Sequence, residues 1–279
     1  MSGFIRISMV GILIFLACDF QDPSNFSSME EQLRVDFIDV GQGNACLLRR
    51  GDHAMLLDAG PDSAGLLDSL QNRGVDSLDW VLLSHGHRDH CGGLWELLGH
   101  VPIGRIWVGP DTATLWTMDS VRHQASLEAV PLDSLFRGDT LPNLSPWKAR
   151  ILWPARGARV SENGASLVVL IKSGCASLLY VGDLEQEQEA VLLQLEPDLH
   201  AAILQVGHHG SATSSSLAFL GQVGPEQAVI CVGANNPWGH PRAETLARLA
   251  LVLGDSSHIW RTDLDGSLAL ILQQGFGFW

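Results

Sequence analysis

Lysine is nearly missing from this sequence of 279 residues: only Lys148 and Lys172 occur among 17 basic residues, against 31 acidic ones. The chain therefore has no polybasic segment, and its net charge is −14. A protein that wraps long duplex DNA normally shows the opposite balance, so the composition argues against that class. Cysteine is also scarce, because five cysteines in a chain this long do not make a disulfide scaffold.

Apolar residues, in contrast, are plentiful. They make up 46% of the sequence, whereas charged residues make up 17%, which excludes a wholly disordered chain and allows a large core. A length of 279 residues is near the upper limit for one domain. The eleven histidines are spaced unevenly, which points to sites rather than to general surface composition.

The N-terminal segment has the features of an export signal. Met1–Ala17 carries one charge, Arg6, and the apolar run Ile7–Ala17 is shorter than the roughly 20 residues that span a bilayer. The small residue Ala17 directly precedes Cys18, an arrangement that resembles a bacterial lipobox. We therefore expect an exported lipoprotein of the cell envelope, periplasmic or on the outer face of the cytoplasmic membrane, anchored to the membrane through a lipid on Cys18. An ordinary signal peptide or a short hydrophobic anchor is the alternative.

Residues 18–32 are polar, acidic and without periodicity, which predicts a tether. In residues 33–279, strand-like and helix-like runs alternate, which predicts one α/β domain of two similar halves, with two sheets sandwiched between helices. The predicted strands are Val35–Val40, Cys46–Arg50, His53–Asp58, Trp80–Ser84, Arg150–Trp153, Ser166–Ile171, Ser177–Val181, Ala201–Val206, Gln227–Val232, His258–Arg261 and Ser267–Leu272. The predicted helices are Ser63–Arg73, Gly93–Leu98, Thr112–Val130, Glu185–Leu195, Ser215–Gln222 and Arg242–Leu253.

The strongest chemical signal follows the apolar run Trp80–Leu83, where His85, His87, Asp89 and His90 occur within six residues. Extended residues two apart point the same way, so His85 and His87 can converge on one ion. Asp89 and His90 lie about half a turn further on and can face a second ion. Imidazoles together with a carboxylate suit Zn²⁺, Mn²⁺ or Fe²⁺.

Two further clusters each follow a predicted strand. Gly182 and Asp183 end one strand, and there Asp183 can bridge two ions. His208 and His209 follow another strand. Strand ends on one side of a sheet can assemble a site from distant segments, so the three clusters together indicate one metal centre.

These motifs, with others along the chain, resemble the metallo-β-lactamase superfamily and, more narrowly, the soluble hydrolase domain of ComEC-type DNA-uptake proteins. The resemblance covers roughly residues 33–273. Besides the histidine cluster it involves Asp39–Ala45, Leu57–Gly60, Gly92–Leu94, Arg137–Leu141, Asn163 with Ser166, Gly182–Asp183, His208–Ser211, Asn236–Pro241 and Arg261–Asp263 with Gly266. It implies a four-layer αββα sandwich. The transmembrane channel of ComEC is absent from this sequence, so uptake itself is not inferred.

The resemblance also implies a centre of two divalent metal ions, Zn²⁺ or Mn²⁺. His85 and His87 would hold the first ion, Asp89 and His90 the second, and Asp183 would bridge them. Either His208 or His209 would complete the second ion's ligands, and the sequence does not choose between the two.

Three further positions bear on this centre. Asp58 resembles the superfamily's aspartate that orients a metal-binding histidine. Asn163 lies near the place where many members have another metal-binding histidine, and an amide oxygen is a harder and weaker ligand. Asn44 stands where the subgroup usually has aspartate.

Catalysis would use a metal-bridged hydroxide that attacks phosphorus or an acyl carbon. Asp89 is a candidate catalytic residue, and His240 is a candidate general acid or oxyanion donor. Ser211 and Asn236 are candidates to bind a phosphate oxygen. The function predicted first is that of a phosphodiesterase or nuclease acting on small phosphodiesters or single-stranded nucleic acid. A hydrolase of another ester (a phosphocholine ester, lactone or thioester) and a metal-binding scaffold without turnover are the alternatives.

Overall fold

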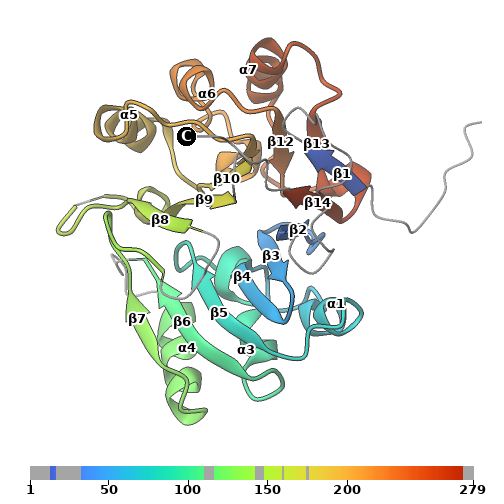
Figure 1. Cartoon of the computed structure of the whole chain (residues 1–279), viewed down its shortest axis with the longest axis vertical. Helices are drawn as coiled ribbons and strands as arrows, with labels where there is room; N and C mark the ends of the chain where they lie inside the picture. The colour runs from blue at the N-terminus through green and yellow to red at the C-terminus, as the bar shows by residue number, and fades with distance from the viewer. Residues whose placement is uncertain are drawn as a thin grey trace, which may run out of the picture.

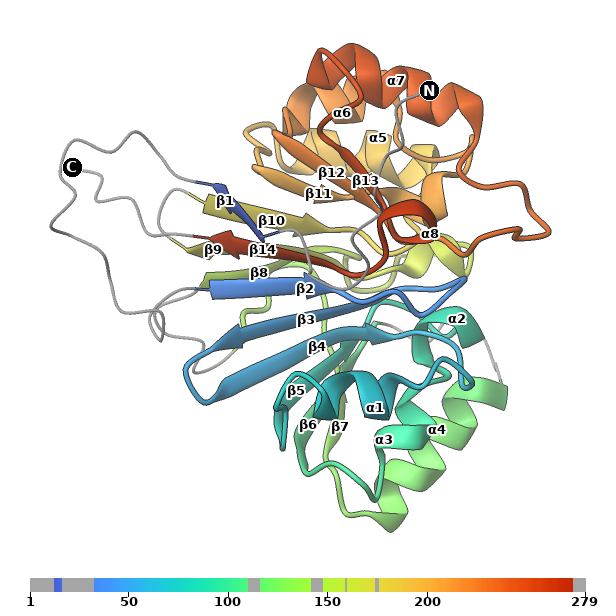
Figure 2. The same cartoon turned by 90° about the vertical axis from the view of Figure 1, so that its right-hand side faces the viewer.

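The structure of the chain is a computed structural model. It describes residues 13–16, 33–109, 116–141, 148–158, 160–173 and 176–272. Two sheets lie face to face in the middle of the molecule, and helices cover the outer face of each (Figure 2). The predicted four-layer αββα sandwich is therefore confirmed.

The first sheet has eight strands in the order β1-β14-β2-β3-β4-β5-β6-β7. Their bounds are β1 Leu13–Leu16, β2 Leu33–Phe37, β3 Ala45–Arg50, β4 His53–Ala59, β5 Leu78–Leu83, β6 Ile103–Val108, β7 Leu132–Ser134 and β14 Leu268–Leu272. Strands β14, β2, β3 and β4 pair antiparallel, whereas β4 through β7 pair parallel. The parallel strands carry their carboxyl ends to a common edge, where loops can meet.

The second sheet has six strands in the order β13-β12-β11-β10-β9-β8. Their bounds are β8 Lys148–Trp153, β9 Val168–Ser173, β10 Ala176–Tyr180, β11 Ile203–Gln205, β12 Gln227–Ile230 and β13 Ile259–Arg261. Strands β8, β9 and β10 pair antiparallel, and β10 through β13 pair parallel. Both sheets thus combine an antiparallel with a parallel part, although β14 returns from the second half of the chain to the first sheet.

The helices form the outer layers. Helices α1 (Leu66–Gln71), α3 (Leu94–Leu97) and α4 (Trp116–Leu127) lie on the first sheet, and α5 (Gln186–Leu195), α6 (Leu217–Val223) and α7 (Ala243–Leu253) lie on the second (Figures 1 and 2). The short elements α2 (Arg88–Cys91), η2 (Asn163–Ala165), η3 (Gly207–Gly210) and α8 (Thr262–Asp265) occur in the connections.

Local sequence explains the ends of helix α6. The Ser216 hydroxyl accepts a hydrogen bond from the Phe219 N–H and so caps the N-terminus. Gly224 ends the helix with φ 54°, a left-handed conformation that glycine adopts without a side-chain clash. The core-facing side chains Phe219, Leu220 and Val223 are buried between these two ends.

Apolar side chains fill three layers of core. One cluster joins the two sheets and includes Phe37, Leu57, Tyr180 and Cys231. The other two lie between each sheet and its helices. The central strands are buried on both faces, which accounts for their continuous apolar runs.

All predicted strands and helices are present, with ends shifted by a few residues. Strands β6 and β7 were not predicted, although β6 pairs with both β5 and β7. The boundaries of the leader, the tether and the domain stay predictions. Residues 13–16 of the predicted leader form strand β1 beside β14. Cys18 and the predicted tether, residues 18–32, lie outside the described residues.

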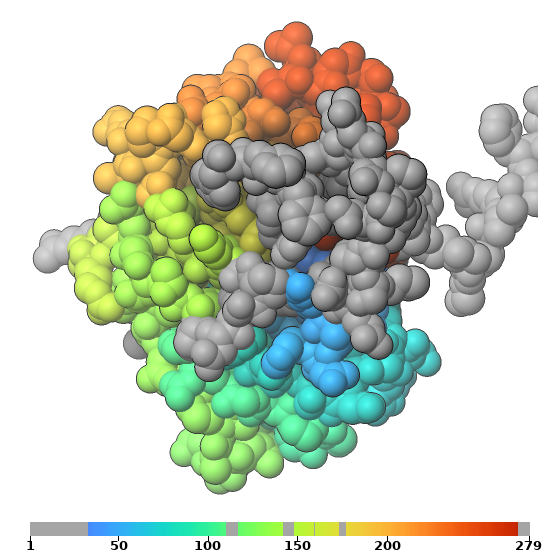
Figure 3. All heavy atoms as spheres, viewed as in Figure 1, coloured from blue at the N-terminus to red at the C-terminus, as the bar shows by residue number. Residues whose placement is uncertain are grey.

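Among the described residues, no helix is both long and apolar enough to cross a membrane. In Figure 3 the second half of the chain forms the upper part of the visible face, and the first half forms the lower part.

Candidate metal centre

The connection after β5 places the first ligand group. His85 and His87 flank Gly86, and their Nε2 and Nδ1 atoms lie 2.9 Å apart. Asp183, in the connection that follows β10, completes a group of three ligand atoms that lie within 4.8 Å of one another. The predicted convergence of His85 and His87 is therefore present in the structure.

A second group lies beside the first. Helix α2 carries Asp89 and His90, and η3 brings in His209, whose Nε2 atom lies 3.2 Å from Asp89 Oδ2. The ligand atoms of these three residues also lie within 4.8 Å of one another. Helix α2 begins at Arg88, and His87 just before it has an extended backbone. The change from extended chain to helix therefore places His85 and His87 in the first group, and Asp89 and His90 in the second.

Asp183 approaches both groups. Its Oδ1 atom lies 3.1 Å from His90 Nε2, and its Oδ2 atom lies 3.6 Å from His209 Nε2 and 4.0 Å from His85 Nε2. Asp183 as a whole residue is 2% exposed, so its carboxylate is directed into the protein. This position is the one that a bridging ligand would occupy.

Two polar side chains hold the turn that presents Asp183. The Ser166 hydroxyl accepts a hydrogen bond from the Asp183 N–H at 3.0 Å. The Gln205 amide oxygen accepts from the N–H groups of Val181 and Gly182. Because Gly182 has φ 55° and a Cβ atom would meet the Ser84 side chain at 2.7 Å, this position requires glycine.

Three of the imidazoles have buried partners on the nitrogen that faces away from the cluster. His90 Nδ1 lies 2.7 Å from Asp58 Oδ2, and His209 Nδ1 lies 2.8 Å from the Cys231 carbonyl oxygen. His85 Nδ1 lies 3.1 Å from the Ser84 hydroxyl. Partners of this kind fix the tautomer and the ring orientation of metal-binding histidines.

Asp58 does more than orient His90. Its carboxylate also accepts hydrogen bonds from the Ser84 N–H and hydroxyl and from the Tyr180 hydroxyl. Tyr180 belongs to the second sheet and Asp58 to the first, so one buried carboxylate joins the two sheets beneath the candidate centre.

The electrostatics of the cluster suit bound cations. Burial opposes charge on Asp183, but the neighbouring histidines His90 and His209 outweigh it and lower the pKa of this carboxyl well below its usual value. Burial likewise opposes charge on His90, but the carboxylates of Asp183 and Asp58 raise the pKa of this imidazole well above its usual value. The carboxylates are thus held ionised and bind cationic charge, which metal ions can supply in place of protons.

Buried polar atoms that lack partners show whether the residues of the cluster fit metal ions. His90 Nε2 and Asp183 Oδ1 are buried and face each other at 3.1 Å, and neither has a further hydrogen-bond partner. The Asn163 amide oxygen and both polar side-chain atoms of Asn44 are also buried without a hydrogen-bond partner. Buried polar atoms normally have partners. Since four imidazoles and two carboxylates converge around His90 Nε2 and Asp183 Oδ1, the residues present fit divalent metal ions.

Of the two consecutive histidines, His209 has the geometry of a ligand. His208 Nε2 lies 3.8 Å from Asp183 Oδ2, its Nδ1 atom lies 3.5 Å from Glu185 Oε1, and its ring lies 5.6 Å from the His240 ring. Both histidines have positive φ, 47° and 52°, so the sharp η3 turn directs the two rings differently.

The remaining predicted residues have local contacts. The Asn236 amide accepts a hydrogen bond from the His240 N–H and donates to the carbonyl oxygens of Gly233 and His240, so it shapes the loop that carries His240. The Ser211 hydroxyl contacts the Thr213 side chain and N–H. The phosphate-binding roles of Asn236 and Ser211 stay predictions.

Sequence reasoning missed Glu162 and Gln205. Glu162 Oε2 lies 2.8 Å from His87 Nε2. Gln205 is fully buried in an otherwise apolar strand, and this isolated amide within an apolar run was the signal that could have identified it. Glu162 lies in a polar loop, where a glutamate carries no such signal.

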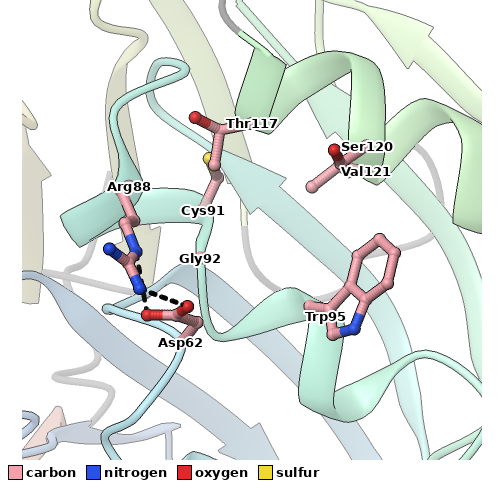
Figure 4. A pocket seen from close by; sticks show the side chains of 8 residues that line it. All are labelled: Asp62, Arg88, Cys91, Gly92, Trp95, Thr117, Ser120 and Val121. Carbon is pink, nitrogen blue, oxygen red and sulfur yellow. Dashed lines mark hydrogen bonds and ion pairs between the residues drawn. The ribbon is translucent and has the colours of Figure 1, made fainter.

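A pocket of about 230 Å³ lies against helix α2 (Figure 4). Among the side chains that line it are Asp62, Arg88, Cys91, Trp95, Thr117 and Ser120. Arg88 and Asp62 form an ion pair there. The Cys91 thiol donates to the Gly86 carbonyl oxygen at 3.3 Å, and the residue is fully buried in the core between the first sheet and its helices.

An αββα sandwich with a histidine and aspartate centre at its sheet edge defines a class of metal-binding hydrolases. Residues 38–234 match the family model described as "Metallo-beta-lactamase superfamily". The chain belongs to this superfamily, whose members are generally metal-dependent hydrolases.

Several curated proteins are similar over most of this chain. "ComE operon protein 3" of Bacillus subtilis is 30% identical over 265 residues, which cover 87% of this chain and 33% of the relative. "Competence protein ComA" of Neisseria gonorrhoeae is 32% identical over 250 residues, which cover 88% of this chain and 33% of the relative. The chain therefore spans about a third of the length of these relatives.

Solved structures share the fold at low identity. The "metallo-beta-lactamase fold protein YhfI from Bacillus subtilis" has a TM-score of 0.59 and 14% identity and covers 87% of this chain and 100% of its own. A structure described as "a New Diphosphatase from the PhnP Family" has a TM-score of 0.53 and 14% identity, covering 86% of this chain and 99% of its own.

Proposed function

We propose that this chain is a phosphodiesterase that uses two divalent metal ions, Zn²⁺ or Mn²⁺, and acts on small phosphodiesters or single-stranded nucleic acid. The observation that carries this proposal is the position of Asp183 between the two groups of ligand atoms. A pair of adjacent ions suits in-line displacement at phosphorus.

The chain's own residues would hold the two ions. His85, His87 and Asp183 would bind the first, and the second would take Asp89, His90 and His209 together with Asp183. Ions bound there would lower the pKa of water and polarise a phosphoryl oxygen. The protein would supply the fixed geometry, because the outer partners of the imidazoles leave each ligand nitrogen directed inward.

The relatives support a nucleic-acid substrate. "Competence protein ComA" is named for competence, and "Recombination protein 2" of Haemophilus influenzae is named for recombination. Four arginines, Arg49, Arg88, Arg150 and Arg156, are balanced locally, since each pairs with a different carboxylate. This local balance favours short single strands over long duplexes.

His240 has the properties of an oxyanion donor rather than a general acid. Burial, reinforced by His208, His209 and Arg242, lowers the pKa of His240 to about 4, so the ring is neutral at pH 7. A neutral imidazole donates a hydrogen bond without transferring its proton. Its Nδ1 atom is buried and has no partner, which leaves it available to a bound group.

We expect His240→Ala to keep its metal content and lose about 10²- to 10³-fold in kcat, the usual effect of removing one oxyanion donor. Because the pKa of His240 is lowered, its ring stays neutral down to about pH 5. The pH profile of kcat near pH 6.5 should therefore have the same form in wild type and in the variant. His240→Gln, which retains an N–H donor, is the matched control and should keep more activity. If kcat of the wild type changed with pH near 6.5 and this change were absent from both variants, His240 would be a general acid instead.

A thioester hydrolase is the second candidate. "Hydroxyacylglutathione hydrolase" of Aeromonas hydrophila is 41% identical over 64 residues, which cover 23% of this chain and 24% of the relative. The first candidate is preferred because the competence proteins match a much larger share of this chain.

The test is a comparison of substrates with the metal-loaded chain. Turnover of bis-p-nitrophenyl phosphate and of single-stranded DNA, abolished by chelation and restored by Zn²⁺ or Mn²⁺, is expected. Turnover confined to a glutathione thioester would support the second candidate instead. Metal binding without turnover of any of these substrates would leave the scaffold function.

We also propose export and lipid anchoring through Cys18, on the basis of the N-terminal segment. Wild type should label with a palmitate analogue in bacterial cells, whereas Cys18→Ala should not. Equal labelling of both forms would remove this proposal.

A further inference from the structure

His87 differs from the other ligand histidines in its surroundings. The rings of His85, His90 and His209 are almost fully buried, whereas the His87 side chain is 32% exposed. Its neighbour Glu162, 44% exposed at the side chain, immediately precedes η2 and places Oε2 at 2.8 Å from His87 Nε2. The pair therefore lies at the rim of the candidate centre.

The two ring nitrogens of His87 face different groups. Nδ1 lies 2.9 Å from His85 Nε2, the nitrogen that also approaches Asp183. Two imidazole nitrogens this close can bind one ion only if both present lone pairs. Because the ring nitrogens of an imidazole point in divergent directions, the Glu162 carboxylate on Nε2 is on the side of the ring away from that ion.

We propose that Glu162 is a positioning residue for His87. It accepts a hydrogen bond from Nε2–H, which places the proton on that nitrogen, leaves the Nδ1 lone pair for the metal and holds the ring toward His85. This inference rests on the metal binding in the proposed function and not on the hydrolysis.

The pattern of the other imidazoles supports this role. His90 has Asp58, His209 has the Cys231 carbonyl oxygen and His85 has the Ser84 hydroxyl on the nitrogen that faces away from the cluster. His87 Nε2 has Glu162 as its hydrogen-bond partner among the residues that the structure describes. With Glu162 included, all four ligand imidazoles have such a partner.

The first ligand group has particular need of this contact. It contains two imidazoles and shares its carboxylate, Asp183, with the second group, which has Asp89 in addition. A half-exposed imidazole without a partner can rotate and exchange tautomers through water. Loss of such an outer partner typically weakens metal binding 10- to 100-fold.

The experiment measures binding of Zn²⁺ and of Co²⁺ to metal-free protein, by competition with a chromophoric chelator and by the Co²⁺ absorption bands. Two binding steps with different affinities are expected for the wild type. In Glu162→Ala the step of lower affinity should lose about 10- to 100-fold in affinity, and its Co²⁺ spectrum should change. Glu162→Gln, whose amide oxygen can still accept from Nε2–H, should recover most of the affinity.

Glu187→Gln is the matched control, because it removes an equal charge from the exposed surface of helix α5. This variant should bind like wild type, and the unfolding midpoint of the metal-free protein should be equal in all variants. Wild-type affinity and spectrum in Glu162→Ala would overturn the proposal, as would a wild type that binds neither metal. An inactive enzyme with the expected binding pattern would instead overturn only the proposed hydrolysis.

Discussion

Replacement of Asp183 by alanine is expected to remove metal from both ligand groups and to lower hydrolysis by on the order of 10³-fold or more. Its carboxylate approaches His90 and His209 of one group and His85 of the other, so the variant lacks a ligand of each. Metal ions contribute several kcal/mol to the transition state, and each 1.36 kcal/mol is a factor of about ten in rate. Metal analysis after gel filtration and the kcat on bis-p-nitrophenyl phosphate measure the two effects.

Asp183→Asn separates charge from shape. The amide retains an oxygen ligand, and the backbone N–H can still donate to Ser166, so the turn is preserved. We expect intermediate metal content for this variant. If Asp183→Ala retained the metal content of wild type, the assignment of Asp183 between the two groups would be refuted.

Asp58→Ala should have the largest effect on stability. The variant leaves the Ser84 N–H, the Tyr180 hydroxyl and the buried His90 ring without their acceptor. Removing one partner of a buried charged pair typically costs about 3 to 5 kcal/mol of unfolding free energy. Urea denaturation in the presence of a chelator isolates this effect from metal binding.

Tyr180→Phe provides the smaller matched change, because it removes one hydrogen bond to Asp58 and retains the ring in the core between the sheets. A loss of about 1 kcal/mol is expected. An Asp58→Ala variant no less stable than Tyr180→Phe would show that the carboxylate does not join the sheets as described.

The histidine cluster was predictable because its geometry is local. Strand β5 ends just before His85, and a residue spacing of two directs His85 and His87 alike. The choice between His208 and His209 was not predictable, because it depends on two consecutive residues with positive φ, which non-glycine residues seldom adopt.

The fold was predictable in its layers but not in every strand. Strand β6, Ile103–Val108, contains a glycine and an arginine and is stabilised by parallel pairing with β5 and β7, which are distant in sequence. Likewise, the contact of Glu162 with His87 spans 75 residues. Neither has a local pattern, so only the tertiary structure reveals them.

Helix α2 is one turn long, and its two faces border different parts of the molecule. Asp89 and His90 face the candidate centre, whereas Arg88 and Cys91 line the pocket behind it. A small molecule seated in that pocket would press on the same turn that carries two ligands. The side chains that line this pocket, Trp95 and Ser120 among them, are therefore part of the packing that holds the turn with the two ligands in place.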